Sequence, residues 1–97
     1  MTPYGIGETV LRQISDLAKR NRIQKVILFG SRARGDFSRT SDIDLAVQGG
    51  NPCRFRLDAE EETHTLLTFD VVDLDSVLSP ELREAIHREG VLLYEEI

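Results

Sequence analysis

Cysteine, histidine and long apolar runs are scarce in this sequence, and each shortage excludes a class of protein. The single cysteine, Cys53, excludes an internal disulfide and fits a reducing cytoplasm. With only two histidines beside it, the chain offers no spacing that resembles a zinc site. The longest apolar stretches, such as residues 26–29, are far too short to span a bilayer, and no signal-peptide pattern opens the N-terminus. We therefore expect a cytoplasmic protein with no membrane partner.

Length and composition indicate one ordinary soluble domain. The 97 residues include 40% hydrophobic and 30% charged side chains, which argues against disorder. No repeat, low-complexity segment or linker interrupts them, and we predict a single domain over residues 1–97. The net charge of −5 argues against a protein whose main task is to grip a nucleic-acid backbone.

The apolar periodicity predicts an alternation of helices and strands. Helices are expected over residues 7–20, about 52–66 and from Pro80 to a stop at Gly90, and strands over 25–29, 41–48, 69–74 and 91–94. The middle helix carries only a weak apolar stripe of Phe55, Ala59 and Leu66. This order describes an α/β (α+β) fold, a small mixed sheet of about four strands with helices on one face. The other face of the sheet is then left for chemistry.

Two aspartates stand out on the predicted strand over residues 41–48. Asp42 and Asp44 are two positions apart, so on a strand both point to the same side, while the residues between and after them form an apolar side. Two carboxylates so close repel unless a cation lies between them. A hard divalent cation that also binds substrate phosphates, usually Mg²⁺, is the natural occupant. A plain solvated face is the alternative, and alone the pair is a weak signal.

A glycine-serine pair, Gly30-Ser31, follows the predicted buried strand over residues 25–29. Glycine lets the backbone approach a ligand closely, and a serine hydroxyl with successive backbone N–H groups can cradle phosphate oxygens. By itself the pair is also typical of a tight turn. The full spacing of Gly-Ser, ten residues and Asp-x-Asp fixes four positions, and chance would give it to about one such chain in a thousand. The combination therefore indicates a site for phosphate and metal.

Basic residues are concentrated around this loop. Between Lys19 and Arg39 there are seven of them against one acid, Asp36. Such a run is usually a solvated face. Because it surrounds the loop suited to phosphate, we expect it to help attract polyphosphate.

These residues resemble the nucleotidyltransferases of the DNA polymerase β superfamily, and within it the minimal nucleotidyltransferase (MNT) domains of bacteria and archaea. The similarity rests on residues 28–47, LFGSRARGDFSRTSDIDLAV, and the order of elements agrees over nearly the whole chain. Such domains are similar to the MNT antitoxins that pair with HEPN toxins, which are short helical RNases. The resemblance implies a palm fold like that of polymerase β. It also implies that Gly30 and Ser31 hold the triphosphate of ATP and that Asp42 and Asp44 bind two Mg²⁺ ions.

The resemblance further implies a third catalytic carboxylate, a metal ligand or base, on a neighbouring strand. The candidates are Asp70, Asp73 and Asp75. Strand alternation allows two frames, one with Asp70 at the site and one with Asp73 and Asp75 there. The family pattern of apolar-Asp-apolar-apolar matches residues 69–72 and favours Asp70.

Two arginines follow the glycine-serine pair. Arg32 and Arg34 are near enough in sequence to bind the β- and γ-phosphates, and the guanidinium fork suits such contacts. They could instead be exposed charges on a short helical turn. Gly35 is expected to shape the loop.

Three functions are open at this point. By resemblance, the first is a protein adenylyltransferase that moves AMP from ATP to a hydroxyl, a tyrosine, of a HEPN-type toxin partner and acts as its antitoxin. The second is transfer to a small molecule or an RNA end held by a separate substrate-binding subunit. The third is a non-catalytic antitoxin that neutralises its partner by binding. A chain this short carries the catalytic half and little else, so each version predicts a hetero-oligomer.

Overall fold

The computed structural model describes residues 3–97, so the first two residues of the predicted domain lie outside it. The elements follow one another as η1 (Pro3–Gly5), α1 (Glu8–Arg20), β1 (Lys25–Phe29), α2 (Ser31–Arg34), β2 (Ile43–Gln48), α3 (Pro52–Glu62), β3 (Phe69–Asp73), α4 (Pro80–Glu89) and β4 (Val91–Glu95). Each predicted helix and strand is present, within a few residues of its predicted ends. The short turn η1 is additional, and α2 is the short helical turn that was left open for Arg32 and Arg34. No helix in residues 3–97 has the length and apolar character to span a bilayer.

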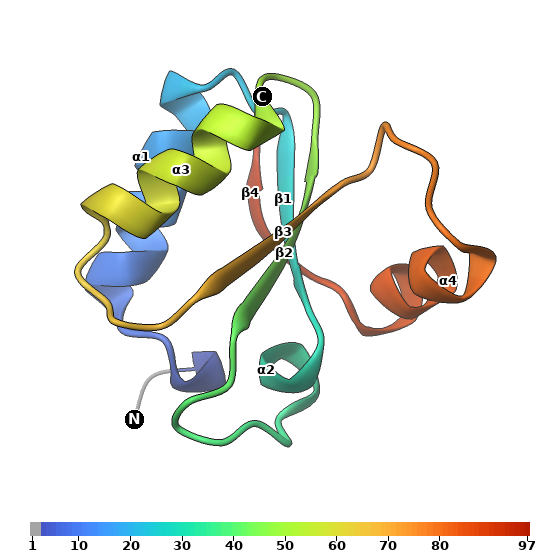
Figure 1. The fold of residues 1–97 in the computed structure, drawn as a ribbon, viewed down its shortest axis with the longest axis horizontal. Coiled ribbons are helices and arrows are strands. Elements are labelled where there is room, and N and C mark those ends of the chain that lie inside the picture. The colour runs from blue at the N-terminus through green and yellow to red at the C-terminus, as the bar shows by residue number, and fades with distance from the viewer. Residues whose placement is uncertain (1–2) are drawn as a thin grey trace.

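The four strands form one mixed sheet in the order β3-β2-β1-β4 (Figure 1). β1 pairs antiparallel with both β2 and β4, whereas β2 and β3 run parallel. Because β2 and β3 are parallel neighbours, both of them begin at the same end of the sheet. The loop that leaves β1 lies at this end too, since β1 runs the opposite way.

The main core lies between α1 and α3 and one face of the sheet. The amphipathic pattern of α1 turns Ile14 inward, and Phe55 of α3 and Leu45 of β2 meet it in one cluster of fully buried side chains. These contacts anchor β2 by its apolar side. The other side of the same strand therefore presents the aspartates to the opposite face.

That opposite face is covered in part by α4, which corrects the prediction of helices on one face only. Figure 1 shows α1 and α3 on one side of the sheet and α4 on the other. Ile86 of α4 packs against Phe29 and Ala46, with Ile27 and Val72 at the margin. These side chains are apolar, so α4 stabilises the fold by removing apolar surface of the second face from water. The mixed-sheet fold itself is confirmed.

The middle helix is shorter than predicted. α3 ends at Glu62, Thr63 is extended, and the Thr63 hydroxyl donates to the carbonyl of Ala59. The chain must then return to the start of β3, where the Ile43 N–H donates to the carbonyl of Thr68 at 2.9 Å. Leu66 lies on this connection and is fully exposed, so its predicted place in the apolar stripe was wrong.

Candidate active site

Gly30 links β1 to the one-turn helix α2 and faces Asp44 of β2. Its φ of 77° and ψ of −157° are torsions that L side chains avoid. A Cβ placed on Gly30 would lie 2.2 Å from Oδ2 of Asp44. Glycine is therefore required here for two reasons. Its backbone torsions disfavour any other residue, and the Asp44 carboxylate leaves no room for a Cβ. Ser31 follows, half-buried, as the first residue of α2.

The loop after α2 begins at Gly35, as expected. Gly35 adopts a left-handed φ of 93°, and its N–H donates to the carbonyl of Ser31 at 2.9 Å. This turn ends the helix after four residues. The chain then runs through residues 36–42 to the start of β2.

Three aspartates meet at the end of the sheet where β2 and β3 begin. Asp44 is paired with Asp70 in the parallel register of these two strands and with Phe29 of β1. Asp42 lies two residues before Asp44, just outside β2, and is exposed. The structure thus brings together both acids of the Asp-x-Asp pair and Asp70.

The pKa of Asp44 is shifted by its burial and by these neighbouring acids. Burial raises the pKa of Asp44, the charges of Asp70 and Asp42 raise it further, and Arg34 and Arg32 oppose the shift. The rise means that a proton, or another cation, is favoured beside Asp44. Across residues 3–97, no three His, Cys, Asp or Glu side chains form a ready-made metal cage.

The other two candidates for the third acid lie elsewhere. Asp73 pairs with Val47, whose side chain is in the main core, at the far end of β3. Its carboxylate accepts from the N–H of Asp75 at 2.9 Å, and Asp75 in turn accepts from the N–H of Gly49 at 2.9 Å. Both acids therefore stabilise the turn after β3, at the opposite end of the strand from Asp70.

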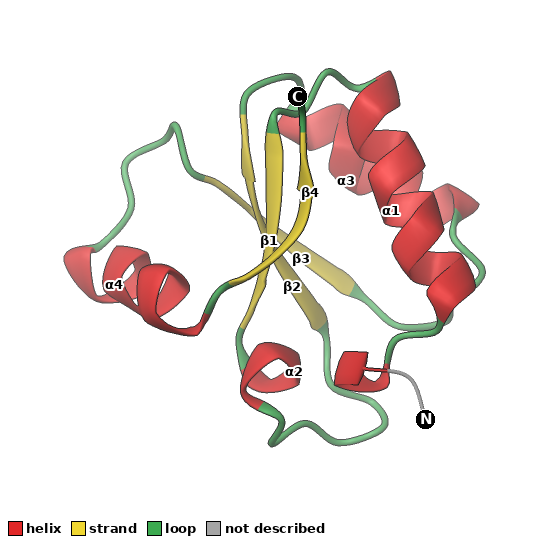
Figure 2. Cartoon of the chain, turned by 180° about the vertical axis from the view of Figure 1, so that it is seen from behind, coloured by secondary structure: helices red, strands yellow, loops and turns green. Residues whose placement is uncertain are grey.

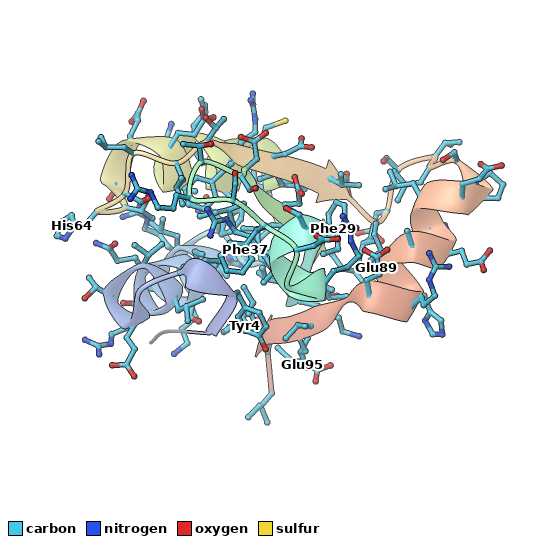
Figure 3. The ribbon with its side chains drawn as sticks, turned by 90° about the horizontal axis from the view of Figure 1, so that it is seen from below. Tyr4, Phe29, Phe37, His64, Glu89 and Glu95 are labelled. Atoms are coloured by element: carbon cyan, nitrogen blue, oxygen red, sulfur yellow. The ribbon has the colours of Figure 1, made fainter. Side chains whose placement is uncertain are left out.

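Arg34 is exposed beside the site and ion-paired. Its guanidinium contacts the carboxylate of Asp36 at 3.1 Å and that of Glu89 in α4 at 2.9 Å. Glu89 is largely buried, with 14% of its side chain exposed. Sequence reasoning missed Glu89, although an acid in the last turn of a helix opposes the helix dipole and signals a cation nearby. Figure 3 shows Glu89 and Phe37 on opposite sides of α2.

Arg32 fits neither of its predicted roles. The residue is 1% exposed, so it is not a solvated charge. Its guanidinium donates to backbone carbonyls, including that of Ser41 at 3.0 Å and that of Tyr4 at 3.0 Å. These donors are therefore occupied inside the protein, and we leave Arg32 out of the proposed phosphate ligands.

The basic run of the sequence is divided between the two ends of the sheet. Lys19 and Lys25 lie near the start of β1, whereas Arg34 and Arg39 follow its end. Figure 1 shows the connection from α1 to β1 at the top and α2 at the bottom. A strand of this length separates the two groups by roughly 16 Å. Only the second group therefore surrounds the candidate site, in contrast to the expectation for the whole run.

Comparison with known proteins identifies the family. The model described as "Polymerase beta, Nucleotidyltransferase" matches residues 12–96, which is most of the chain. The chain therefore belongs to this family of nucleotidyltransferases. A Methanocaldococcus jannaschii protein named "Putative protein adenylyltransferase" is 36% identical, and the match covers 77% of this chain and 82% of that protein.

Two solved structures extend the similarity to toxin–antitoxin systems. The crystal structure of a toxin–antitoxin with AMP-PNP matches with a TM-score of 0.73 and 26% identity, over 89% of this chain and 73% of that one. A mutant of the toxin–antitoxin MntA–HpeT matches with a TM-score of 0.69 and 26% identity, over 88% and 72%. The predicted nucleotidyltransferase fold and the similarity to MNT antitoxins are thus confirmed.

Proposed function

We propose that this chain is a magnesium-dependent protein adenylyltransferase that moves AMP from ATP to a hydroxyl of a partner protein. The observation that carries the proposal is the meeting of three carboxylates, from Asp42, Asp44 and Asp70, with the glycine turn at Gly30. Nucleotidyl transfer needs such acids beside a loop that phosphate can approach. The adenylyltransferase name of the archaeal relative and the AMP-PNP in a similar structure support ATP as the donor.

The chemistry of these side chains fits Mg²⁺. All three offer carboxylate oxygens, and the raised pKa of Asp44 indicates that a cation beside it would relieve repulsion. Mg²⁺ is usually held by one or two carboxylates together with substrate phosphates, so a complete protein cage is not needed. We therefore assign Asp42, Asp44 and Asp70 as the residues that would hold two ions. When bound, the ions supply charge neutralisation for the attacking and leaving oxygens.

The remaining residues bind and orient ATP. In this proposal Gly30 leaves room for the triphosphate to approach the backbone, and the Ser31 hydroxyl and N–H donate to its oxygens. Arg34 exchanges its contact with Asp36 or Glu89 for the β- and γ-phosphates. The acceptor oxygen then forms a bond to the α-phosphorus as the bond to the β-phosphate oxygen breaks. Pyrophosphate leaves, and the hydroxyl proton goes to Asp70 or to solvent.

We further propose that the acceptor is a tyrosine on a HEPN-type toxin and that its modification makes this chain the antitoxin. The support is the similarity to two structures whose antitoxins were crystallised with their toxins. The protein would then work in the cytoplasm as one minimal domain inside a hetero-oligomer.

Label transfer tests the proposal. The purified chain is incubated with Mg²⁺, its partner protein and ATP labelled at either the α- or the γ-phosphate, beside an Asp42→Asn, Asp44→Asn double variant. We expect the α-label, but not the γ-label, on a tyrosine of the partner with the wild type only. Label on a small molecule or an RNA end would mean that this molecule, and not the partner protein, is the acceptor. No label at all, with equal protection of cells by both forms, would leave a binding antitoxin.

A further inference from the structure

One buried guanidinium joins three segments that are far apart in the sequence. Arg32 of α2 donates through Nε to the carbonyl of Ser41 at 3.0 Å and through Nη2 to that of Arg39 at 3.4 Å. Its Nη1 donates to the carbonyls of Tyr4 at 3.0 Å and Gly5 at 3.2 Å. The guanidinium thus holds both the N-terminal turn η1 and the loop that leads into β2. Figure 2 shows α2 and this N-terminal turn side by side below the sheet.

The packing around Arg32 is tight on both sides. Its guanidinium carbon lies 4.9 Å from the centroid of the Phe37 ring, within the range of a cation–π contact. A Cβ placed on Gly5 would lie 2.4 Å from Cε2 of Phe37 and 2.8 Å from Nη1 of Arg32. The loop is also closed on itself, because the N–H of Ser38 donates to Oγ of Ser41 at 2.9 Å. Loop, ring and N-terminal turn therefore have little freedom to move independently.

Among the three site acids, Asp42 depends most on this loop. Asp44 and Asp70 lie inside strands and are held by the pairing of β2 with β3. Asp42 precedes β2 and has no place in the ladder. Its two neighbours in the chain are held by hydrogen bonds. The Ile43 N–H donates to the carbonyl of Thr68, and the Ser41 carbonyl accepts from Arg32.

We propose that Arg32 is a positioning residue for metal binding, which sets the direction of the Asp42 carboxylate by holding the Ser41 carbonyl. The inference rests on the proposed function, since it assigns Asp42 to the bound Mg²⁺. The N-terminal turn then belongs to the scaffold of the site, because it shares the same guanidinium. Lysine cannot replace Arg32, since one ammonium lacks the planar fork that reaches carbonyls in three directions.

A double-mutant cycle tests the inference through binding and not through activity. The affinity for AMP-PNP at saturating Mg²⁺ is measured by calorimetry for wild type, Arg32→Lys, Asp42→Asn and the double variant. We expect Arg32→Lys to weaken binding about tenfold, as the loss of a residue that orients a metal ligand does. In the Asp42→Asn background the same substitution should change the affinity little, because the metal ligand that Arg32 positions is already lost. Arg39→Lys, an exposed side chain on the same loop, is the matched control.

A second pair of variants reaches Arg32 from the N-terminal side, should Arg32→Lys fail to fold. Gly5→Ala places a methyl group against Phe37 and Arg32, whereas a Cβ on Gly7 meets nothing within 4 Å. We expect Gly5→Ala to weaken binding and Gly7→Ala to leave it unchanged. An equal loss from Arg32→Lys with and without Asp42 would overturn the positioning role. Failure of the wild type to bind Mg²⁺ and AMP-PNP would instead overturn the proposed function.

Discussion

At the residue scale, the ionised carboxylate of Asp44 lowers the stability of the fold, although the proposed reaction requires it. Its pKa is raised by burial and by Asp70 and Asp42, so the folded chain binds this proton more tightly than the unfolded chain does. Ionised Asp44 therefore costs stability at pH 7, and the cost disappears as the pH falls through the raised pKa. We expect Asp44→Asn to abolish transfer and to raise the free energy of unfolding by roughly 0.5–1 kcal/mol, or about 2–8 °C in Tm.

Thermal unfolding in the absence of ligand checks this expectation, with Asp73→Asn as the control. Asp73 also lies on a strand, but its carboxylate only accepts from the N–H of Asp75, which an asparagine oxygen can do as well. Asp73→Asn should leave Tm nearly unchanged. In the wild type, Mg²⁺ with AMP-PNP should raise Tm by linkage, and Asp44→Asn should lose most of that rise. A lower Tm for Asp44→Asn without ligand would contradict the repulsion argument.

Gly30 gives a second prediction at the residue scale. Gly30→Ala combines an unfavourable positive φ with a methyl group 2.2 Å from the Asp44 carboxylate, so we expect a loss of about 2–4 kcal/mol and no transfer. Gly35→Ala also has a positive φ, but its Cβ meets nothing within 4 Å, so it should lose only the backbone part. Denaturant unfolding measures both. Gly30→Ala should be partly rescued by Asp44→Ala, and the absence of rescue would show that the clash is not the cause.

At the scale of elements, α1 and α3 are tied by a buried carboxylate. Asp58 of α3 has 3% of its side chain exposed and accepts from Asn21 at 3.0 Å, while Arg20 at 3.1 Å and Arg54 at 3.2 Å complete the charge balance. The hydrogen bond from Asn21, followed by Arg20, lowers the pKa of Asp58. Its ionised form therefore stabilises the fold above the ordinary pKa of 3.8, and that stability is lost as the pH falls through the lowered pKa.

We expect Asp58→Asn to lower Tm at pH 7 and the difference from wild type to shrink as the pH is taken below 3.8. Glu60→Gln on the same helix is the control, because its pair with Arg56 at 3.6 Å is exposed on both sides and contributes little. Melting curves from pH 7 down to pH 3 measure both variants. A constant difference across this range would mean that Asp58 acts through its shape and not through its charge.

The elements that sequence periodicity predicted are those whose structure is local. β1 ends where its apolar run does and begins one residue before it, and α4 has the serine cap before its proline and a glycine after it. η1 was not predicted, and α2 was only an open alternative for Arg32 and Arg34, because both are short and depend on Arg32 and the loop around it. The place of α4 was missed because Ala46 is small enough to belong to either a polar or an apolar face.

The site was predicted to the extent that spacing determines it. The loop at Gly30 and the pair Asp42 and Asp44 lie close together because β1 and β2 are antiparallel neighbours, which places the end of β1 beside the start of β2. Asp70 needed the register of β3 against β2, which strand alternation alone left open. The burial of Arg32 could not be predicted from the sequence, since its partners are backbone carbonyls of two segments, η1 and the loop before β2, that lie outside its own helix.

For the whole molecule, the division of basic charge between two ends predicts which charges matter for ATP. Arg34 lies near enough to Asp44 to lower its pKa, whereas Lys19 lies at the far end of the sheet, roughly 16 Å away or more. That distance exceeds the Debye length of about 8 Å at physiological salt, so the far charge is screened. Removing one positive charge should therefore have different effects at the two ends.

We expect Arg34→Gln to raise the KM for ATP about tenfold, less than a full charge-assisted contact is worth, because wild-type Arg34 must first leave Asp36 or Glu89. Lys19→Gln, which removes the same charge from the exposed end of α1, should leave KM and kcat unchanged.

Steady-state kinetics of AMP transfer at fixed Mg²⁺ separates the two parameters. Equal increases in KM would mean that net charge attracts the nucleotide from a distance, and raising the salt concentration would then abolish both effects together. An effect of Arg34→Gln that persists at high salt identifies direct contact with phosphate.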